Sequence, residues 1–348
     1  MTRAPRGFAS DNYAGAHPAA LAAIAAANDG HAGAYGADPW TERMAEAIRA
    51  AFGPQAVAYP VFNGTAANVL SLHAVCRPWQ AAICTTNAHL HTDECGAPEG
   101  VAGLKLLALE APDAKLTPEL AERAVVAVGD EHAVQARVIS ITQSTELATV
   151  YAPEQIRALA DYAHENDMLL HVDGARLFNA AAALGVEPRS ITTDAGVDLL
   201  SLGGTKAGLL GAEAVVFLRD GLNDGFRFLR KQKMQLASKQ RYAAAQLTVL
   251  LQDELWRATA GAANAAAARL AAAVGDLPGV EITRPVEANG VFAVLDPAVT
   301  ERLQERWPFY VWNEKTGEVR WMCGWDVTAD DVDAFAADVA DAVGAPVA

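Results

Sequence analysis

Short runs of apolar residues alternate with longer stretches of helical periodicity through the first 220 residues of the chain. Apolar runs of this length, bounded by polar or turn residues, are typical of strands buried on both faces of a sheet. The alternation predicts a mainly parallel sheet covered by helices on both faces, an α/β fold. The predicted strands are 56–62, 81–85, 104–109, 137–142, 168–173, 197–202 and 213–218, and the predicted helices include 65–75, 117–128 and 153–166.

The pattern changes after about residue 220 and predicts a smaller C-terminal α+β domain. Helices are expected at 241–255 and 259–274, short strands at 281–283, 290–295 and 318–324, and a last helix after Thr328, which forms a capping box with Asp331. A chain of 348 residues is long enough for two domains. We place the boundary near Leu250, between a large domain of residues 1–250, which includes the N-terminal segment, and a small domain of residues 251–348.

Composition narrows the classes of function. The chain is 52% hydrophobic, which excludes global disorder, and its formal net charge of −15 argues against nucleic-acid or anionic-membrane partners. No apolar stretch has the length of a signal peptide or a bilayer span. The four cysteines form no CxxC pair, so we expect buried, reduced thiols in a cytoplasmic protein and no metal site.

Three segments place polar residues at the end of a predicted strand, where doubly wound sheets bind their ligands. In LLHVDGAR the strand ends at Asp173, which either needs a cationic partner or caps the next helix. In DLLSLGGTK two glycines precede Lys206, which forms a Schiff base if its pKa is lowered and is otherwise a solvated turn lysine. In FNGTAANVL, Gly64 and Thr65 open a helix, either as an anion site or as an ordinary helix start.

The order of these segments is more specific than any one of them. An anion-binding helix start is followed by an acid at a strand end and then, 33 residues later, by a lysine on a glycine-rich turn. Pyridoxal 5'-phosphate needs these three groups: a phosphate cradle, an acid partner for its ring nitrogen and an amine for its aldehyde.

The chain resembles the low-specificity L-threonine aldolases, which belong to the β-eliminating lyases of the aspartate-aminotransferase-like fold type I. The resemblance covers nearly the whole chain in order. Its motifs are SDNYAGAHP (10–18), AYGADPWT (34–41), GTAAN (64–68), HLHTDECGAPE (89–99), ITQSTELATVY (141–151), HVDGAR (171–176), SLGGTK (201–206), LASKQRY (236–242) and VEANGVF (286–292). It implies retro-aldol cleavage of L-threonine, L-allo-threonine and related β-hydroxy-α-amino acids to glycine and an aldehyde.

The resemblance also implies roles for the residues that bind the cofactor. Lys206 would hold pyridoxal phosphate, Asp173 would pair with the ring nitrogen, Gly64 and Thr65 would bind the phosphate, and His89 would stack on the ring.

Arginines in the matching motifs are implied to bind anionic groups. Arg176, which would also contact the cofactor, and Arg320 would grip the substrate carboxylate, with Ser10 as a third donor. Arg241 would reach the phosphate in a neighbouring subunit, which implies a homodimer or homotetramer with shared active sites.

One departure from the family pattern concerns the base that removes the substrate's hydroxyl proton. Many members have a histidine in the segment that reads QSTE at 143–146, where this chain has Thr145. His89 is the favoured substitute and His132 the next, with His91 and Asp93 placed to tune His89.

Other reactions remain open on the same scaffold. A β-hydroxy amino acid dehydratase or an amino-acid racemase would share the cofactor site. A non-catalytic protein that binds pyridoxal phosphate is a further alternative. Such a protein has no need to keep four residues that serve catalysis, so the presence of Lys206, Asp173, Arg176 and Arg320 argues against it.

Overall fold

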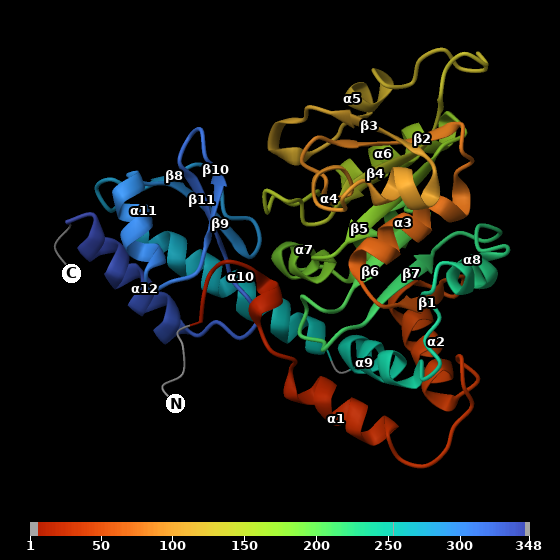
Figure 1. Ribbon diagram of the computed structural model, residues 1–348, viewed down its shortest axis with the longest axis horizontal. Coiled ribbons are helices and arrows are strands. Elements are labelled where there is room, and N and C mark those ends of the chain that lie inside the picture. Colours follow the sequence, from red (N-terminus) through yellow and green to blue (C-terminus); the bar gives the residue numbers. More distant parts are fainter. Residues whose placement is uncertain (1–5, 253, 345–348) are drawn as a thin grey trace.

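A computed structural model describes residues 6–252 and 254–344, and it contains two sheets (Figure 1). The larger sheet has seven strands in the order β1-β7-β6-β5-β4-β2-β3. Neighbours from β6 to β3 run parallel, whereas β7 is antiparallel to both β1 and β6. The strands are β1 (Val57–Val61), β2 (Gln80–Thr85), β3 (Lys105–Leu109), β4 (Gln135–Thr142), β5 (Leu169–Gly174), β6 (Leu199–Gly203) and β7 (Glu213–Phe217). The predicted mainly parallel sheet is confirmed.

Helices cover both faces of this sheet because its strands are apolar on both sides. One face packs on α3 (Gly64–Val75) and α8 (Phe226–Gln232). The other face packs on α2 (Pro39–Phe52), α6 (Pro153–Glu165), α7 (Leu177–Leu184) and α9 (Arg241–Gln252), with α1 (Pro18–Ala27) beyond them (Figure 1). Side chains alternate along a strand. Side chains of β5 therefore point alternately to the two faces. Asp173, near the end of β5, accepts a hydrogen bond from Asn68 of α3.

The smaller sheet is antiparallel, in the order β10-β11-β9-β8. It comprises β8 (Glu281–Ile282), β9 (Gly290–Val294), β10 (Tyr310–Asn313) and β11 (Glu318–Met322), and it packs with α10 (Leu255–Val274), α11 (Pro297–Gln304) and α12 (Ala329–Ala342). The capping box of Thr328 and Asp331 is present at the start of α12. Phe8 lies in this smaller core and stacks on Phe335, with 4.5 Å between ring centroids, although we predicted the N-terminal segment to belong to the large domain. The boundary near Leu250 stays a prediction.

Two local predictions differ from the structure. The helix expected at 117–128 is only α5 (Pro118–Glu122), and the chain turns at Ala127, which has a left-handed φ of 52°. Strand β10 was not predicted, because it is an edge strand whose Tyr310 and Val311 are exposed. Among the described residues, no helix combines the length and the hydropathy needed to cross a bilayer.

Candidate active site

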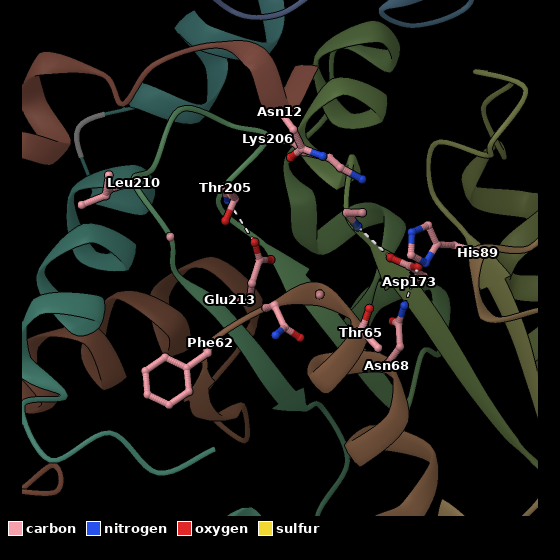
Figure 2. A pocket seen from close by; sticks show the side chains of 14 residues that line it. Asn12, Phe62, Thr65, Asn68, His89, Asp173, Thr205, Lys206, Leu210 and Glu213 are labelled. Atoms are coloured by element: carbon pink, nitrogen blue, oxygen red, sulfur yellow. Dashed lines mark hydrogen bonds between the residues drawn. The ribbon is translucent and has the colours of Figure 1, made fainter. Parts of the chain in front are cut away.

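A pocket lies at the carboxyl edge of the large sheet, where the loops after β1, β5 and β6 meet the start of α3 (Figure 2). Parallel strands bring their carboxyl ends to one edge, so residues far apart in the sequence converge there. Five of the predicted site residues line it: Gly64, Thr65, His89, Asp173 and Lys206. The other lining residues are Asn12, Phe62, Asn63, Asn68, Ala175, Thr205, Leu210, Gly211 and Glu213.

Lys206 follows the turn that ends β6. The two glycines before it are required by close packing. A Cβ on Gly203 would come within 2.7 Å of a neighbouring backbone atom, and one on Gly204 would overlap the carbonyl oxygen of Ala212. Burial and the positive charge of Arg176 lower the pKa of the Lys206 ammonium. The lowered pKa favours the neutral amine, the form that reacts with an aldehyde.

Asp173 lies at the end of β5 and is 4% exposed. Its Oδ2 accepts a hydrogen bond from Asn68 Nδ2 of α3 at 2.8 Å, and its Oδ1 accepts one from the backbone N–H of Ala175 at 2.9 Å. Both donors are neutral. They fix the carboxylate in place without cancelling its charge, so Asp173 presents a negative charge to the pocket.

The start of α3 supplies the anion-binding part of the pocket. Asn63 caps the helix, and its side-chain oxygen accepts a hydrogen bond from the N–H of Ala66 at 2.8 Å. The first N–H groups of a helix have no partner within the helix. Here they belong to Gly64 and Thr65, which line the pocket. The helix dipole adds a partial positive charge at the same place.

His89 begins α4 (His89–Thr92) and is held at two points. Its ring Nδ1 lies 3.0 Å from Glu94 Oε1, and its backbone N–H donates to Glu146 Oε1 at 2.9 Å. The hydrogen bond to Glu94 raises the pKa of His89, burial opposes the rise, and the charge of Asp173 adds to it. Its side chain remains 38% exposed, toward the pocket.

Residues 143–146, where the family pattern places a histidine, contact the backbone of His89. Thr145 is buried, and its hydroxyl pairs with that of Thr149 at 2.7 Å. The next residue, Glu146, is also buried and accepts hydrogen bonds from His89 and from the Thr142 hydroxyl. Thr145 therefore offers no base in this chain.

One edge of the Arg176 guanidinium is already paired. Its Nε and Nη2 donate to the Asp11 carboxylate at 2.7 and 3.0 Å, and Asn289 Nδ2 donates to the same carboxylate at 3.1 Å. Burial by itself would raise the pKa of Asp11, but the charges of Arg176 and Lys206 hold it at about 2. The sequence did not single out Asp11 as this partner, and the contacts of Arg176 with a substrate carboxylate and with the cofactor stay predictions.

Arg320, unlike Arg176, has no carboxylate paired with its guanidinium in the described part of the chain. It lies on β11 with its guanidinium 4.6 Å from the ring centre of Trp312, and it donates to the carbonyl oxygen of Ala9 at 3.4 Å. In residues 6–252 and 254–344 no carboxylate forms an ion pair with it, and its buried Nε has no partner. Burial, reinforced by the charge of Arg176, lowers the pKa of Arg320 to about 10. Arg320 therefore carries a charge that an anionic ligand would stabilise.

The remaining predicted residues lie outside the pocket lining. Ser10 caps the short helix of Asp11–Tyr13 and accepts a hydrogen bond from Asn12 N–H at 3.2 Å. Arg241 begins α9 and donates to the carbonyl oxygen of Gly30 at 3.3 Å. Its expected contact is with another subunit, so that role stays a prediction.

His132 cannot serve the pocket from where it lies. It is exposed in the loop before β4, and its N–H donates to Asp130. The pocket is at the other end of that strand, and eight residues of β4 span roughly 25 Å. His132 is thereby removed as a candidate base.

Buried carboxylates around the pocket were not predicted individually. Burial raises the pKa values of Glu94, Glu146 and Glu213. Glu213 holds the turn before Lys206, because it accepts hydrogen bonds from the N–H groups of Gly204 and Thr205 at 3.2 Å each. Glu213 could have been noticed in the sequence, because it is the first residue of the otherwise apolar strand EAVVF. A buried carboxylate needs hydrogen-bond donors, so its position predicts such donors nearby.

The residues of the pocket fit pyridoxal phosphate. A lysine whose pKa is lowered, a fixed carboxylate and an open helix start face the same space. The lysine matches the aldehyde of that cofactor, the carboxylate its ring nitrogen, and the helix start its phosphate.

The buried pair of Asp11 and Arg176 leads to a test of stability. The folded-state pKa of Asp11 is below its ordinary 3.8, so the pair stabilises the fold above about pH 4 and the stabilisation is lost as the pH falls toward 2. We expect Asp11→Asn to lose about 3–5 kcal/mol of unfolding free energy at neutral pH, because Arg176 is left buried and unpaired. Urea denaturation between pH 7 and pH 2 measures both effects.

The matched control is Asp333→Asn, which removes an exposed ion pair with Arg269. It should cost less than about 1 kcal/mol. If Asp11→Asn were as stable as this control at neutral pH and followed the wild-type pH dependence, the buried pair would not be a main stabilising contact.

Comparison with known proteins agrees with the geometry of the pocket. Residues 7–298 match the family described as beta-eliminating lyase. Low-specificity L-threonine aldolases from Pseudomonas aeruginosa and from another Pseudomonas strain are 43% and 42% identical to the chain, over 99% and 97% of it and 100% and 98% of their own lengths. The structure of a threonine aldolase from Leishmania major superposes with a TM-score of 0.92 at 28% identity, over 97% of this chain and all of that one. The predicted fold type is confirmed, and the chain belongs to the beta-eliminating lyase family.

Proposed function

We propose that the chain is a pyridoxal-phosphate-dependent L-threonine aldolase. It cleaves L-threonine, L-allo-threonine and related β-hydroxy-α-amino acids reversibly to glycine and an aldehyde. The observation that carries the proposal is the convergence of Lys206, Asp173 and the Gly64–Thr65 helix start in one pocket. The activity named for the Pseudomonas relatives supports the same reaction here.

The cofactor defines what the protein has to do. When bound, pyridoxal phosphate supplies the carbonyl that the amino group of the substrate joins, and it takes up the electron pair of the broken bond. Lys206 would hold the cofactor, Asp173 would keep its ring nitrogen protonated, and the N–H groups of Gly64 and Thr65 would bind its phosphate. His89, at the side of the pocket, would lie against its ring.

Arg320 binds the carboxylate of the substrate. Its charge has no ionic partner among the described residues, and the neighbouring charge of Arg176 makes an incoming anion more favourable still. A guanidinium and a carboxylate form two parallel hydrogen bonds, which fixes orientation as well as position. Ser10 remains a predicted third donor. A carboxylate fixed in this way orients the Cα–Cβ bond for cleavage.

His89 takes the proton from the β-hydroxyl group. As that proton leaves, the C–O bond becomes the carbonyl of the aldehyde and the Cα–Cβ bond breaks, and a proton delivered to Cα then gives glycine. The hydrogen bond to Glu94 raises the pKa of His89 and so stabilises the ring after it has accepted the proton.

We propose that the active enzyme is a homodimer or a homotetramer with shared sites. Exposed apolar residues lie at and near the mouth of the pocket: Phe62 and Leu210 line it and are 56% and 62% exposed. A second copy that covered them would bury apolar area and could bring its own Arg241 to the phosphate. We also retain the cytoplasm as the predicted location, which the four free cysteines support.

Product analysis tests the proposed reaction. Purified protein with added pyridoxal phosphate should convert L-threonine and L-allo-threonine to equal amounts of glycine and acetaldehyde, and a Lys206→Ala control should not. A keto acid with ammonia would identify a dehydratase. Inversion at Cα, which converts L-threonine to D-allo-threonine without release of aldehyde, would identify a racemase, and either result would overturn the proposal.

Replacement of His89 tests the base. His89→Phe keeps an aromatic face but removes the ring nitrogens, so we expect threonine cleavage to fall by about two to four orders of magnitude while cofactor affinity changes much less. His132→Phe is the control and should act like the wild type, because His132 lies at the far end of β4. Full activity in His89→Phe would show that a water or another group is the base.

A further inference from the structure

A chain of hydrogen bonds joins His89 to Asp173 beneath the pocket. Glu94 Oε1 lies 3.0 Å from His89 Nδ1 and accepts a hydrogen bond from Asn68 Nδ2 at 2.8 Å. Asn68 Nδ2 also donates to Asp173 Oδ2 at 2.8 Å. The asparagine amide has two N–H bonds and uses one for each carboxylate. Asn68, Glu94 and Asp173 are each less than 5% exposed.

The chain of hydrogen bonds fixes where the proton of a neutral His89 ring lies. An ionised carboxylate only accepts hydrogen bonds, so the ring must donate to Glu94 through Nδ1–H. In a neutral imidazole the other nitrogen then carries the lone pair. Within the described residues Nε2 of His89 makes no hydrogen bond, and the ring borders the pocket. The lone pair is therefore available to a group bound in the pocket.

Packing alone does not explain this arrangement. Glu94 Oε2 and Asn68 Oδ1 are buried and have no hydrogen-bond partner among the described residues. Buried polar atoms without partners lower stability, and apolar side chains of the same size would avoid that cost.

We propose that Glu94 and Asn68 are positioning residues, with Glu94 holding His89 in the Nδ1–H tautomer and Asn68 keeping that pair at a fixed distance from Asp173. The inference rests on the proposed function only in that His89 acts on the substrate's hydroxyl group. The tautomer and the charge state of the ring do not depend on which substrate is bound.

Charged groups from several elements face His89 and set the direction of the test. Glu94 and Asp173 raise the pKa of His89, while burial and Lys206 lower it. Glu146 also lies close, because it accepts the backbone N–H of His89. Without Glu94, the lowering of the pKa by burial and Lys206 is opposed by the charge of Asp173, which has a smaller effect than burial. The pKa of His89 should then fall below that of a free histidine, whereas a merely loosened loop would bring it to the free value.

The experiment is ¹⁵N NMR of ring-labelled histidine in the full-length protein, with and without pyridoxal phosphate, and with His89→Phe to assign the signal. In the wild type, the neutral His89 ring should carry its proton on Nδ1. Glu94→Gln should lower the pKa of His89 below that of a free histidine. Glu99→Gln, which changes an exposed acid five residues further along the same segment, is the matched control and should leave the pKa of His89 unchanged.

Kinetics of the same variants add a second readout. In Glu94→Gln, kcat should fall by at least about tenfold, the lower end of the effect of removing a carboxylate that orients a metal-binding histidine. KM should change little, because Arg320 is untouched. The acidic limb of the pH profile should move down with the pKa of His89.

Two results would overturn the inference. One is a neutral wild-type ring protonated on Nε2, which needs no variant and so holds even where Glu94→Gln does not fold. The other is a folded Glu94→Gln protein in which the pKa of His89 equals that of the Glu99→Gln control. Neither result bears on product formation from L-threonine, so failure of this inference is distinct from failure of the proposed function.

Discussion

The buried ion pair between Asp11 and Arg176 is the contact on which the arrangement around the pocket depends. It joins the N-terminal segment to the start of α7, and Asn289 connects the same carboxylate to the small sheet. Two charges taken out of water are stable only when each is fully hydrogen-bonded. The pair therefore fixes three parts of the chain to one another at the edge of the large sheet.

The same pair determines which charges a ligand meets. Asp11 pairs with Arg176, whereas no carboxylate among the described residues forms an ion pair with the neighbouring Arg320. Burial and the residual charge of Arg176 lower the pKa of Lys206. A pocket with an acid at one side, a lysine of lowered pKa at another and an open helix start is suited to a phosphorylated aldehyde and an amino acid.

Much of this was predictable from sequence because the signals are local. Buried parallel strands are continuous apolar runs, so the seven strands of the large sheet were predicted to within a few residues. Lys206 after two glycines and Asp173 at a strand end are likewise local features, and the fold brought them to one pocket.

The parts that were not predicted depend on contacts between distant residues. Asp11 and Arg176 are 165 residues apart in sequence, and nothing in either segment signals the other. Asn68 and Glu94 lie inside recognised motifs, yet their shared hydrogen bond depends on how α3 packs beside α4. The position of His132 followed from the direction of β4. Charge pairing and packing, rather than local propensity, decide such features.

In the proposed enzyme, this pocket holds pyridoxal phosphate through Lys206. Borohydride reduction of the protein loaded with pyridoxal phosphate, followed by peptide mapping, tests it directly. We expect one pyridoxyl group, on the peptide that contains Lys206. A label on Lys231, Lys233 or Lys239, in the basic segment before α9, would contradict it.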